Sequence, residues 1–303
     1  MGVYYMIENP IFLENDMNLQ SLSQTRSMSL FKRSLLVLFL VLSALMDLWG
    51  VDYVWNLDSN NGNWNNSANW FDGSGYGTGV PGATDTATIQ STTNGPPTTN
   101  VPVNLQLSGL TISTDWDIST ITSVTINGDL NLNNGTLTLG NVPLAVQGNI
   151  NRISGSLTST GTITLNGSSG VQSVNLTGGT IQDLVVNNTS GTPTVTLNNT
   201  AAFTWNGNLT ITAGTLVLAN LSQTIGGNVS GAGTLDADAI TGGNTLTVGG
   251  YMGTTGTALG TLLAPTSTSV SVGTDWNVTN FTHNSGTVIF TGTGTIYSAA
   301  SFY

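Results

Sequence analysis

Small polar dipeptides recur about every twenty residues, and this feature limits the possible folds more than any other. They interrupt runs in which apolar and polar residues alternate, and they begin at Ser108, Asn127, Gln147, Asn166, Asn187, Asn206, Gly226 and Gly249. All the steps between them are close to twenty, and the last, from Gly226 to Gly249, is slightly longer than the others. A period of this size, sustained over so many units, is the sequence signature of a stacked repeat architecture.

A second marker, Gly followed by Thr or Ser and an apolar residue, follows several of these dipeptides. It occurs at Gly135, Gly155, Gly214 and Gly233. The runs between markers are only four or five residues long and alternate with period two, which indicates short strands with one buried face. We therefore predict an all-β fold, a parallel β-helix (β-solenoid) with coils of about 20 residues. The alternative is a set of antiparallel β-sandwich domains, which also consist of many short strands.

Residues 51–104 precede the regular repeat and contain three tryptophans, two of them in the stretch "NGNWNNSANW". A solenoid exposes its apolar interior at each end, so this segment is predicted to be an N-terminal cap. Trp64 and Trp70 lie on one face if the segment is extended, and we interpret them as the plug of that cap. A sugar-binding platform is the alternative interpretation. Residues 105–303 form the repeat region, and the hypothesis is that it continues beyond Tyr303 in the native gene product.

The amino-terminal region has the pattern of an export signal. Lys32 and Arg33 precede twelve largely apolar residues, 35–46, and this pattern predicts a signal peptide over residues 28–50. A twelve-residue helix spans about 18 Å, less than the hydrocarbon core of about 30 Å, which disfavours a stable membrane anchor. Residues 1–27 read as an upstream extension, and we hypothesise that Met28 is the true start.

The charge pattern excludes several classes of partner. Only 6% of the 303 residues are charged. Beyond Gly50 the chain contains eleven Asp and one Arg, Arg152, but no Lys or Glu. Phosphate neutralisation needs clustered Lys and Arg, so no nucleic-acid partner is expected. Contact with a membrane is expected only through the export signal or through an anchor beyond Tyr303. Cysteine is absent, which excludes disulfides and thiolate metal sites.

The stretch "VWNLDSNNGNWNNSANW", followed by "GVPGATDTATI", resembles the opening of bacterial secreted β-helix repeat proteins. The later segments "IQDLVVNN" and "FTHNSGTVIFTGTGT" resemble repeats of the same autotransporter-like and haemagglutinin-like surface proteins. The resemblance covers residues 51–303 through motifs of composition rather than of invariant residues. It implies an exported, cell-surface or extracellular protein with an adhesive or structural role, and it transfers no catalytic residue.

Two pairs of carboxylates are the only candidates for chemistry or metal binding. These are Asp115 with Asp117 and Asp236 with Asp238, each spaced so that both side chains lie on one side of a strand. Either pair suggests a calcium site, although a calcium ion normally takes six to eight oxygen ligands. The preferred interpretation is solvated Asp near a turn, with no metal and no cofactor. His283, the sole histidine, has no local signature of a catalytic triad.

Trp116 and Trp276 lie in similar contexts, "STDWDIST" and "GTDWNVTN", and their separation equals eight units of twenty. If the period holds, they occupy equivalent positions of the coil. Exposed indoles at such positions would stack on sugars, so Trp64, Trp70, Trp116 and Trp276 are the candidate glycan contacts. Inward or corner packing is the preferred interpretation of Trp116 and Trp276.

These observations together predict an exported, non-enzymatic solenoid with a structural or adhesive role, secreted or held at a bacterial cell surface. Its expected partners are a surface glycan, a matrix component or a cell-surface protein. The alternative is a carbohydrate-binding accessory region, or a fragment of a polysaccharide-degrading β-helix enzyme.

Overall fold

The computed structural model describes residues 50–55, 61–90, 92–93, 95–168, 170–189 and 194–297. Residues 50–303 form one unit, and residues 1–49 fall outside it. The hypothetical start at Met28 and the predicted signal peptide, up to residue 49, lie outside the described residues. Within the ranges given above, no helix is both long enough and apolar enough to cross a membrane.

The unit of residues 50–303 is a parallel β-solenoid of about nine turns, with coils of about 21 residues. Strands of consecutive coils pair in parallel: Leu110, for example, lies opposite Leu130 of the next coil. Among the described strands only the first two pair antiparallel. The predicted fold class is therefore confirmed, and the sandwich alternative is wrong because it requires antiparallel neighbours throughout.

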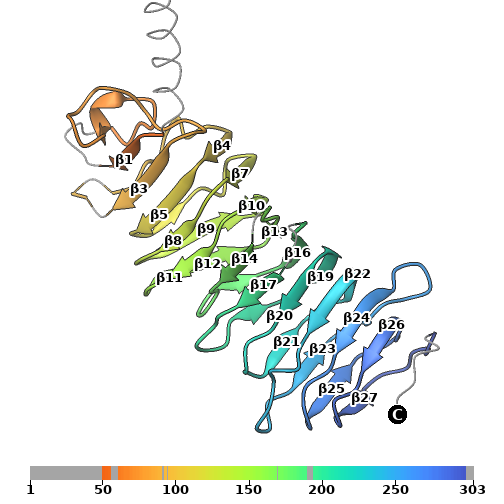
Figure 1. Cartoon of the computed structure of the whole chain (residues 1–303). Coiled ribbons are helices and arrows are strands. Elements are labelled where there is room, and N and C mark those ends of the chain that lie inside the picture. The colour runs from red at the N-terminus through yellow and green to blue at the C-terminus, as the bar shows by residue number, and fades with distance from the viewer. Residues whose placement is uncertain are drawn as a thin grey trace, which may run out of the picture. The chain divides into compact units, whose positions relative to one another are not determined.

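Each complete coil contributes strands to three faces of the solenoid (Figure 1). The first face contains β4 (Asn104–Leu107), β7 (Ser123–Ile126), β10 (Leu144–Val146), β13 (Thr162–Leu165), β16 (Asp183–Asn187) and β19 (Leu209–Ala213). The second face contains β1 (Asp52–Trp55), β3 (Thr86–Gln90), β5 (Gly109–Ser113), β8 (Leu130–Leu132), β11 (Ile150–Arg152), β14 (Val171–Val174), β17 (Thr194–Leu197) and β20 (Thr215–Val217). The third face contains β6 (Trp116–Asp117), β9 (Thr136–Gly140), β12 (Ser156–Ser159), β15 (Thr180–Ile181) and β18 (Thr204–Trp205), continued by β21 (Gln223–Ile225), β23 (Leu246–Val248), β25 (Ser269–Val272) and β27 (Thr287–Phe290).

The last coils join the first two faces. β22 (Val229–Asp236) pairs at its start with β19 of the first face and at its end with β20 of the second. β24 (Leu259–Leu263) and β26 (Val278–Thr282) stack on it in turn. A continuous strand therefore replaces the turn that separates these faces in the earlier coils.

Alternation along each strand builds the core. In β9 the side chains of Leu137 and Leu139 are fully buried, whereas Thr136 and Thr138 face outward. Parallel pairing stacks like on like, so that Leu110, Leu130 and Ile150 form one apolar column through three coils. Burying a side chain of this size stabilises the fold by about 1.5–3 kcal/mol. One continuous hydrophobic cluster results, running from Tyr53 to Val278.

The sequence markers change corner halfway along the solenoid. The dipeptides from Ser108 to Asn187 lie between the first and second faces, whereas those at Asn206, Gly226 and Gly249 lie between the third and first. The true partner of Asn187 in the next coil is Ala213, and not Asn206. The prediction that the step from Asn187 to Asn206 is one coil repeat was therefore wrong, because both corners select the same small polar residues.

Asn and Asp side chains tie successive coils together at these corners. The Oδ1 atom of Asp183 accepts a hydrogen bond from the backbone N–H of Asn208 at 2.8 Å. Asn208 Oδ1 accepts from the N–H of Asn228 at 2.9 Å, and Asn228 Oδ1 accepts from the N–H of Tyr251 at 3.0 Å. Each of these side-chain oxygens thus satisfies a corner N–H that no strand ladder reaches, which explains the frequency of Asn and Asp at these corners.

Glycine is required beside these ladders by the close approach of coils. A Cβ added to Gly249 would collide with the carbonyl oxygen of Gly226, and one added to Gly273 with that of Gly249. The glycine pairs that begin at Gly226 and Gly249 therefore have a steric role at their corners, because their φ angles are not positive.

At the amino-terminal end, residues 50–104 already take part in parallel pairing. β1 pairs with β3, and β3 pairs with β5 over five residues. β2 (Trp70–Phe71) runs antiparallel to β1 and covers its other edge. The segment predicted as a cap thus also contributes the first strands of the second face.

Candidate functional site

The four tryptophans considered as glycan contacts are buried in the core. Trp64, Trp70 and Trp276 have no exposed surface, and Trp116 is 1% exposed. A sugar stacks on an exposed ring face, and none of these indoles offers one in this structure.

Trp64 and Trp70 belong to an aromatic cluster at the amino-terminal end. The segment between them is not extended, since it contains the 3-10 turn η1 (Ser67–Asn69), but the two rings still meet edge to face at 4.6 Å. Trp70 also contacts Trp55 at 5.0 Å, and its Nε1 atom donates to Trp64 O at 2.8 Å. Trp116 stacks on Trp64 at 6.0 Å. These contacts fit the interpretation of the pair as an apolar plug.

Trp116 and Trp276 do not occupy equivalent positions, contrary to the prediction. Trp116 pairs with Leu137 on the third face. Trp276 bridges Met252, which continues the column of Val229 on the first face. Coil length varies, because the step from Gly231 to its partner Leu259 is much longer than the step from Leu259 to Val278. Two residues separated by a whole number of average coil lengths therefore need not occupy equivalent positions in their coils.

The Asp115 and Asp117 side chains line one open groove with Pro96, Pro97 and Thr98. Each is engaged by the backbone: Asp115 Oδ1 accepts from the N–H of Thr136 at 2.8 Å, and Asp117 Oδ1 accepts from that of Ser119 at 2.9 Å. The hydrogen bonds from Ser119 lower the pKa of Asp117. A glycosidase needs one carboxyl group held protonated, and a lowered pKa works against that role.

Asp236 and Asp238 lie together where β22 ends. Asp236 Oδ1 accepts from the backbone N–H of Asp238 at 3.1 Å. Partial burial, together with the neighbouring charge of Asp238, raises the pKa of Asp236. Within the described ranges, no group of three or more His, Cys, Asp or Glu side chains is placed to hold a metal ion. Both pairs therefore fall short of the ligand number that calcium prefers.

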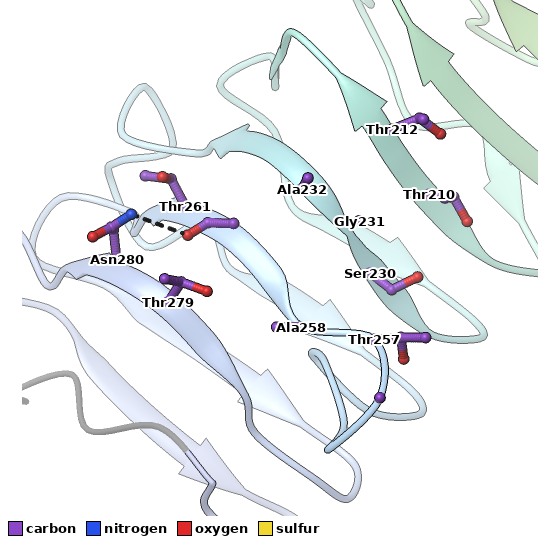
Figure 2. A pocket seen from close by; sticks show the side chains of 12 residues that line it. Thr210, Thr212, Ser230, Gly231, Ala232, Thr257, Ala258, Thr261, Thr279 and Asn280 are labelled. Carbon is purple, nitrogen blue, oxygen red and sulfur yellow. Dashed lines mark hydrogen bonds between the residues drawn. The ribbon is translucent and has the colours of Figure 1, made fainter.

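The site that sequence reasoning missed is an open groove across β19, β22, β24 and β26 (Figure 2). Its volume is about 690 Å³. The polar lining consists of the side chains of Thr210, Thr212, Ser230, Thr257, Thr261, Thr279 and Asn280. Asn280 Nδ2 donates to Gly260 O at 3.4 Å. The groove therefore crosses four consecutive strands at the bend between the first and second faces.

The floor of the groove is shaped by small residues. Gly231 has a φ of +111°, and a Cβ there would collide with the carbonyl oxygen of Ile211. Ala232 and Ala258 add only methyl groups, and Gly260 adds none. In the earlier coils this corner is a polar turn, whereas here a smooth strand bend without large outward side chains leaves a depression. The segments "SGAG" and "TALG" were the available signal, but alternation analysis treats such residues only as breaks.

The lining determines what the groove can hold. None of its side chains titrates near neutral pH, so it offers neither acid-base chemistry nor a charge to select ions. Hydroxyl groups donate and accept hydrogen bonds, and the threonine and alanine methyl groups supply apolar contact. The groove is therefore suited to an uncharged ligand rich in hydroxyl groups.

Comparison with protein-family models, curated proteins and solved structures found no match to this chain. The class that the fold itself defines is the parallel β-solenoid.

Proposed function

We propose that this chain is an exported, non-enzymatic β-solenoid protein with an adhesive or structural role at the cell surface or outside the cell. We further propose that the groove across β19, β22, β24 and β26 binds an uncharged glycan. The observation that carries the proposal is the hydroxyl-lined groove without a titratable side chain. The basic and apolar pattern of residues 28–50 supports export.

A binding role suits the groove better than a catalytic one. Glycoside hydrolysis uses two carboxyl groups that flank the scissile bond, and no carboxyl group lines this groove. Hydrogen bonds to several hydroxyls, each contributing about 0.5–1.5 kcal/mol, give modest affinity at one groove. Modest affinity is compatible with adhesion, where many molecules on a surface act together.

The carbohydrate-binding accessory region is the second candidate function, and the same groove favours it. In that case the glycan bound here is also the substrate of a catalytic region of the complete gene product. Polysaccharide cleavage by that product, lost on Asp115→Ala or Asp236→Ala, would instead support a degrading enzyme.

A glycan-binding experiment tests the proposal. The full chain is immobilised, and the binding of neutral and anionic polysaccharides is measured. Ala232→Arg places a bulky cation on the groove floor and is expected to abolish binding of the neutral ligand. Thr279→Val removes one hydroxyl and is expected to weaken binding about two- to tenfold.

Thr158→Val is the matched control, because Thr158 faces outward on the third face, away from the groove. It should leave affinity unchanged. Lack of binding to every neutral glycan, or binding that Ala232→Arg does not affect, would overturn the assignment of the groove.

A further inference from the structure

The groove across β19, β22, β24 and β26 extends along the axis of the solenoid. Its lining comes from four consecutive strands, which stack on one another in parallel. Neighbouring strands lie about 4.8 Å apart, so three spacings give a length of about 14 Å. A ligand that fills the groove therefore runs along the axis and meets a new coil at each step.

Polar side chains form two rows, one on each side of the groove floor (Figure 2). The first row contains Thr210 and Ser230, which pair in adjacent coils, and Thr257. The second row contains Thr261 and Asn280, which also pair in adjacent coils. Each row therefore offers hydrogen-bonding groups at intervals of about one coil, about 4.8 Å.

The floor between the two rows is small and apolar. Ala232 and Ala258 contribute methyl groups, and Gly231 contributes no side chain. A pyranose ring in an extended chain has C–H groups on its faces and hydroxyl groups along its edges. A ring that lies flat on this floor therefore directs its edges toward the two rows, where hydroxyl and amide groups donate and accept hydrogen bonds. Its face covers the alanine methyl groups from water.

Charge near the groove selects against an acidic sugar. The chain has a formal net charge of −11, and no Lys or Arg follows Arg152 in the sequence. The carboxylate of Asp236 lies further along β22, the strand that carries Ala232 on the groove floor. An anionic polysaccharide would therefore be repelled at this site, whereas an uncharged one would not.

We propose that the groove binds a linear, extended polysaccharide of uncharged β-1,4-linked sugars that runs along the solenoid axis. This inference rests on the proposed glycan-binding function and adds the class of the glycan and its direction. A β-1,4 linkage keeps the chain straight, and the length of one ring in such a chain is close to the coil spacing of about 4.8 Å. Successive rings then meet successive coils. An α-1,4 linkage coils the chain, which lifts it from the floor.

Oligosaccharides of different shape test this proposal. Calorimetry measures the binding of β-1,4-linked glucose and mannose oligosaccharides of increasing length to the full chain. For the tighter-binding of the two series, affinity is expected to rise about two- to tenfold with each added sugar until the four strands are covered. The matched probes are α-1,4-linked glucose oligosaccharides of the same lengths, which should bind at least about tenfold more weakly.

Two variants test the direction of the ligand. Thr210→Val on β19 and Asn280→Ala on β26 remove polar groups from the strands at opposite ends of the groove. Each is expected to weaken binding of the long β-1,4-linked oligosaccharides about two- to tenfold. Each should leave disaccharide binding nearly unchanged, because a disaccharide fills only part of the groove. Thr125→Val is the control, since Thr125 lies outside the groove on β7, and circular dichroism checks that all three variants fold.

The outcomes separate this inference from the proposed function. Lack of binding to every neutral glycan would overturn both. Binding of some neutral glycan but of neither β-1,4-linked series would refute the extended ligand alone. Affinity that does not rise with length, equal affinity for the α-1,4-linked series, or an end variant that binds the long oligosaccharides normally would refute it in the same way.

Discussion

The first coils and the last described coil of the solenoid differ in how well their aromatic side chains are covered. At the amino-terminal end, β2 covers the edge of β1, and Trp55, Trp64 and Trp70 fill the interior. In the last described coil, by contrast, Phe290 and other large apolar side chains are partly exposed. The first coils therefore depend on tight aromatic packing, whereas the aromatic side chains of the last described coil contribute less buried area.

Hydrogen bonding strengthens this contrast. Trp55 Nε1 donates to Gly95 O at 3.0 Å, and Trp116 Nε1 donates to Pro97 O at 2.9 Å. The indoles therefore fill space and also anchor the loop that covers them. Phe290, by comparison, touches Trp276 edge to face at 6.2 Å and is 37% exposed.

The largest expected effect comes from truncating one aromatic side chain at each end. Trp70→Ala should destabilise the amino-terminal end by about 3–5 kcal/mol, because it opens a cavity in a fully buried cluster. Phe290→Ala should cost less than about 1.5 kcal/mol, because the ring is only partly buried. Chemical denaturation with hydrogen exchange resolved by segment measures both losses.

Tyr76→Ala serves as the control, since Tyr76 is 42% exposed near the same cap. Equal losses at Trp70 and Phe290 would show that the carboxyl-terminal end is as well packed as the cap, and the contrast would fail.

An intermediate effect is expected from adding a methyl group between coils. A Cβ on Gly148 would collide with the Gly128 carbonyl group, and a Cβ on Gly292 with the Gly273 oxygen. Gly148→Ala should cost about 1–3 kcal/mol, because coils on both sides hold the backbone in place. Gly292→Ala should cost less, because among the described residues a coil stacks on Gly292 from one side only. Thermal unfolding compares the two variants.

Gly75→Ala is the reference substitution, since its added methyl group meets no atom within 4 Å. A Gly292→Ala variant that is destabilised as much as Gly148→Ala would indicate that the last coil is held rigidly.

The smallest expected effect lies between the ends, at Asp236, whose pKa is raised mainly by burial. A raised pKa means that the folded state binds the proton more tightly than the unfolded state does. This group therefore lowers stability at neutral pH and ceases to do so as the pH falls through its folded pKa towards the ordinary value of 3.8. Asp236→Asn should stabilise the chain at pH 7 by no more than about 0.5 kcal/mol, because water screens a half-exposed carboxylate.

The measurement is the difference in melting temperature between Asp236→Asn and the unmodified chain, at pH 7 and below the ordinary pKa of an aspartate. The difference should vanish at the lower pH. Taking a difference cancels the opposite trend of Asp72 and Asp117, whose hydrogen-bonded carboxylates have lowered pKa values. An equal increase in melting temperature at both pH values would show that the charge of Asp236 is not the cause of the stabilisation.

The sequence alone was enough to predict the solenoid, because alternation and turn residues report directly on which side chains face inward. It could not assign the corners, since Asn127 and Asn206 have the same local chemistry but lie at different corners. Which residues are equivalent in successive coils is set by strand pairing. The longer coil from Asn187 to Ala213 cannot be recognised from the local sequence.

The candidate groove was harder still to predict. It results from the small size of the residues at Gly231, Ala232 and Gly260, together with hydroxyl groups from four different strands. The tryptophans were candidates for glycan contact on sequence grounds, but Trp64 and Trp116 are buried in the core. Large apolar side chains are more often buried in a core than exposed for ligand binding, and the tryptophans of this chain follow that rule.

The unequal coils have a consequence for how such a chain tolerates insertions and deletions. Extra residues at a corner lengthen a loop without altering which side chains of the neighbouring strands point inward, and the cost of loop length grows slowly. One extra residue within a strand would turn every following side chain of that strand to the opposite face. Length variation should therefore accumulate at the three corners, where new loops can change what the surface presents while the ladders beneath them remain in register.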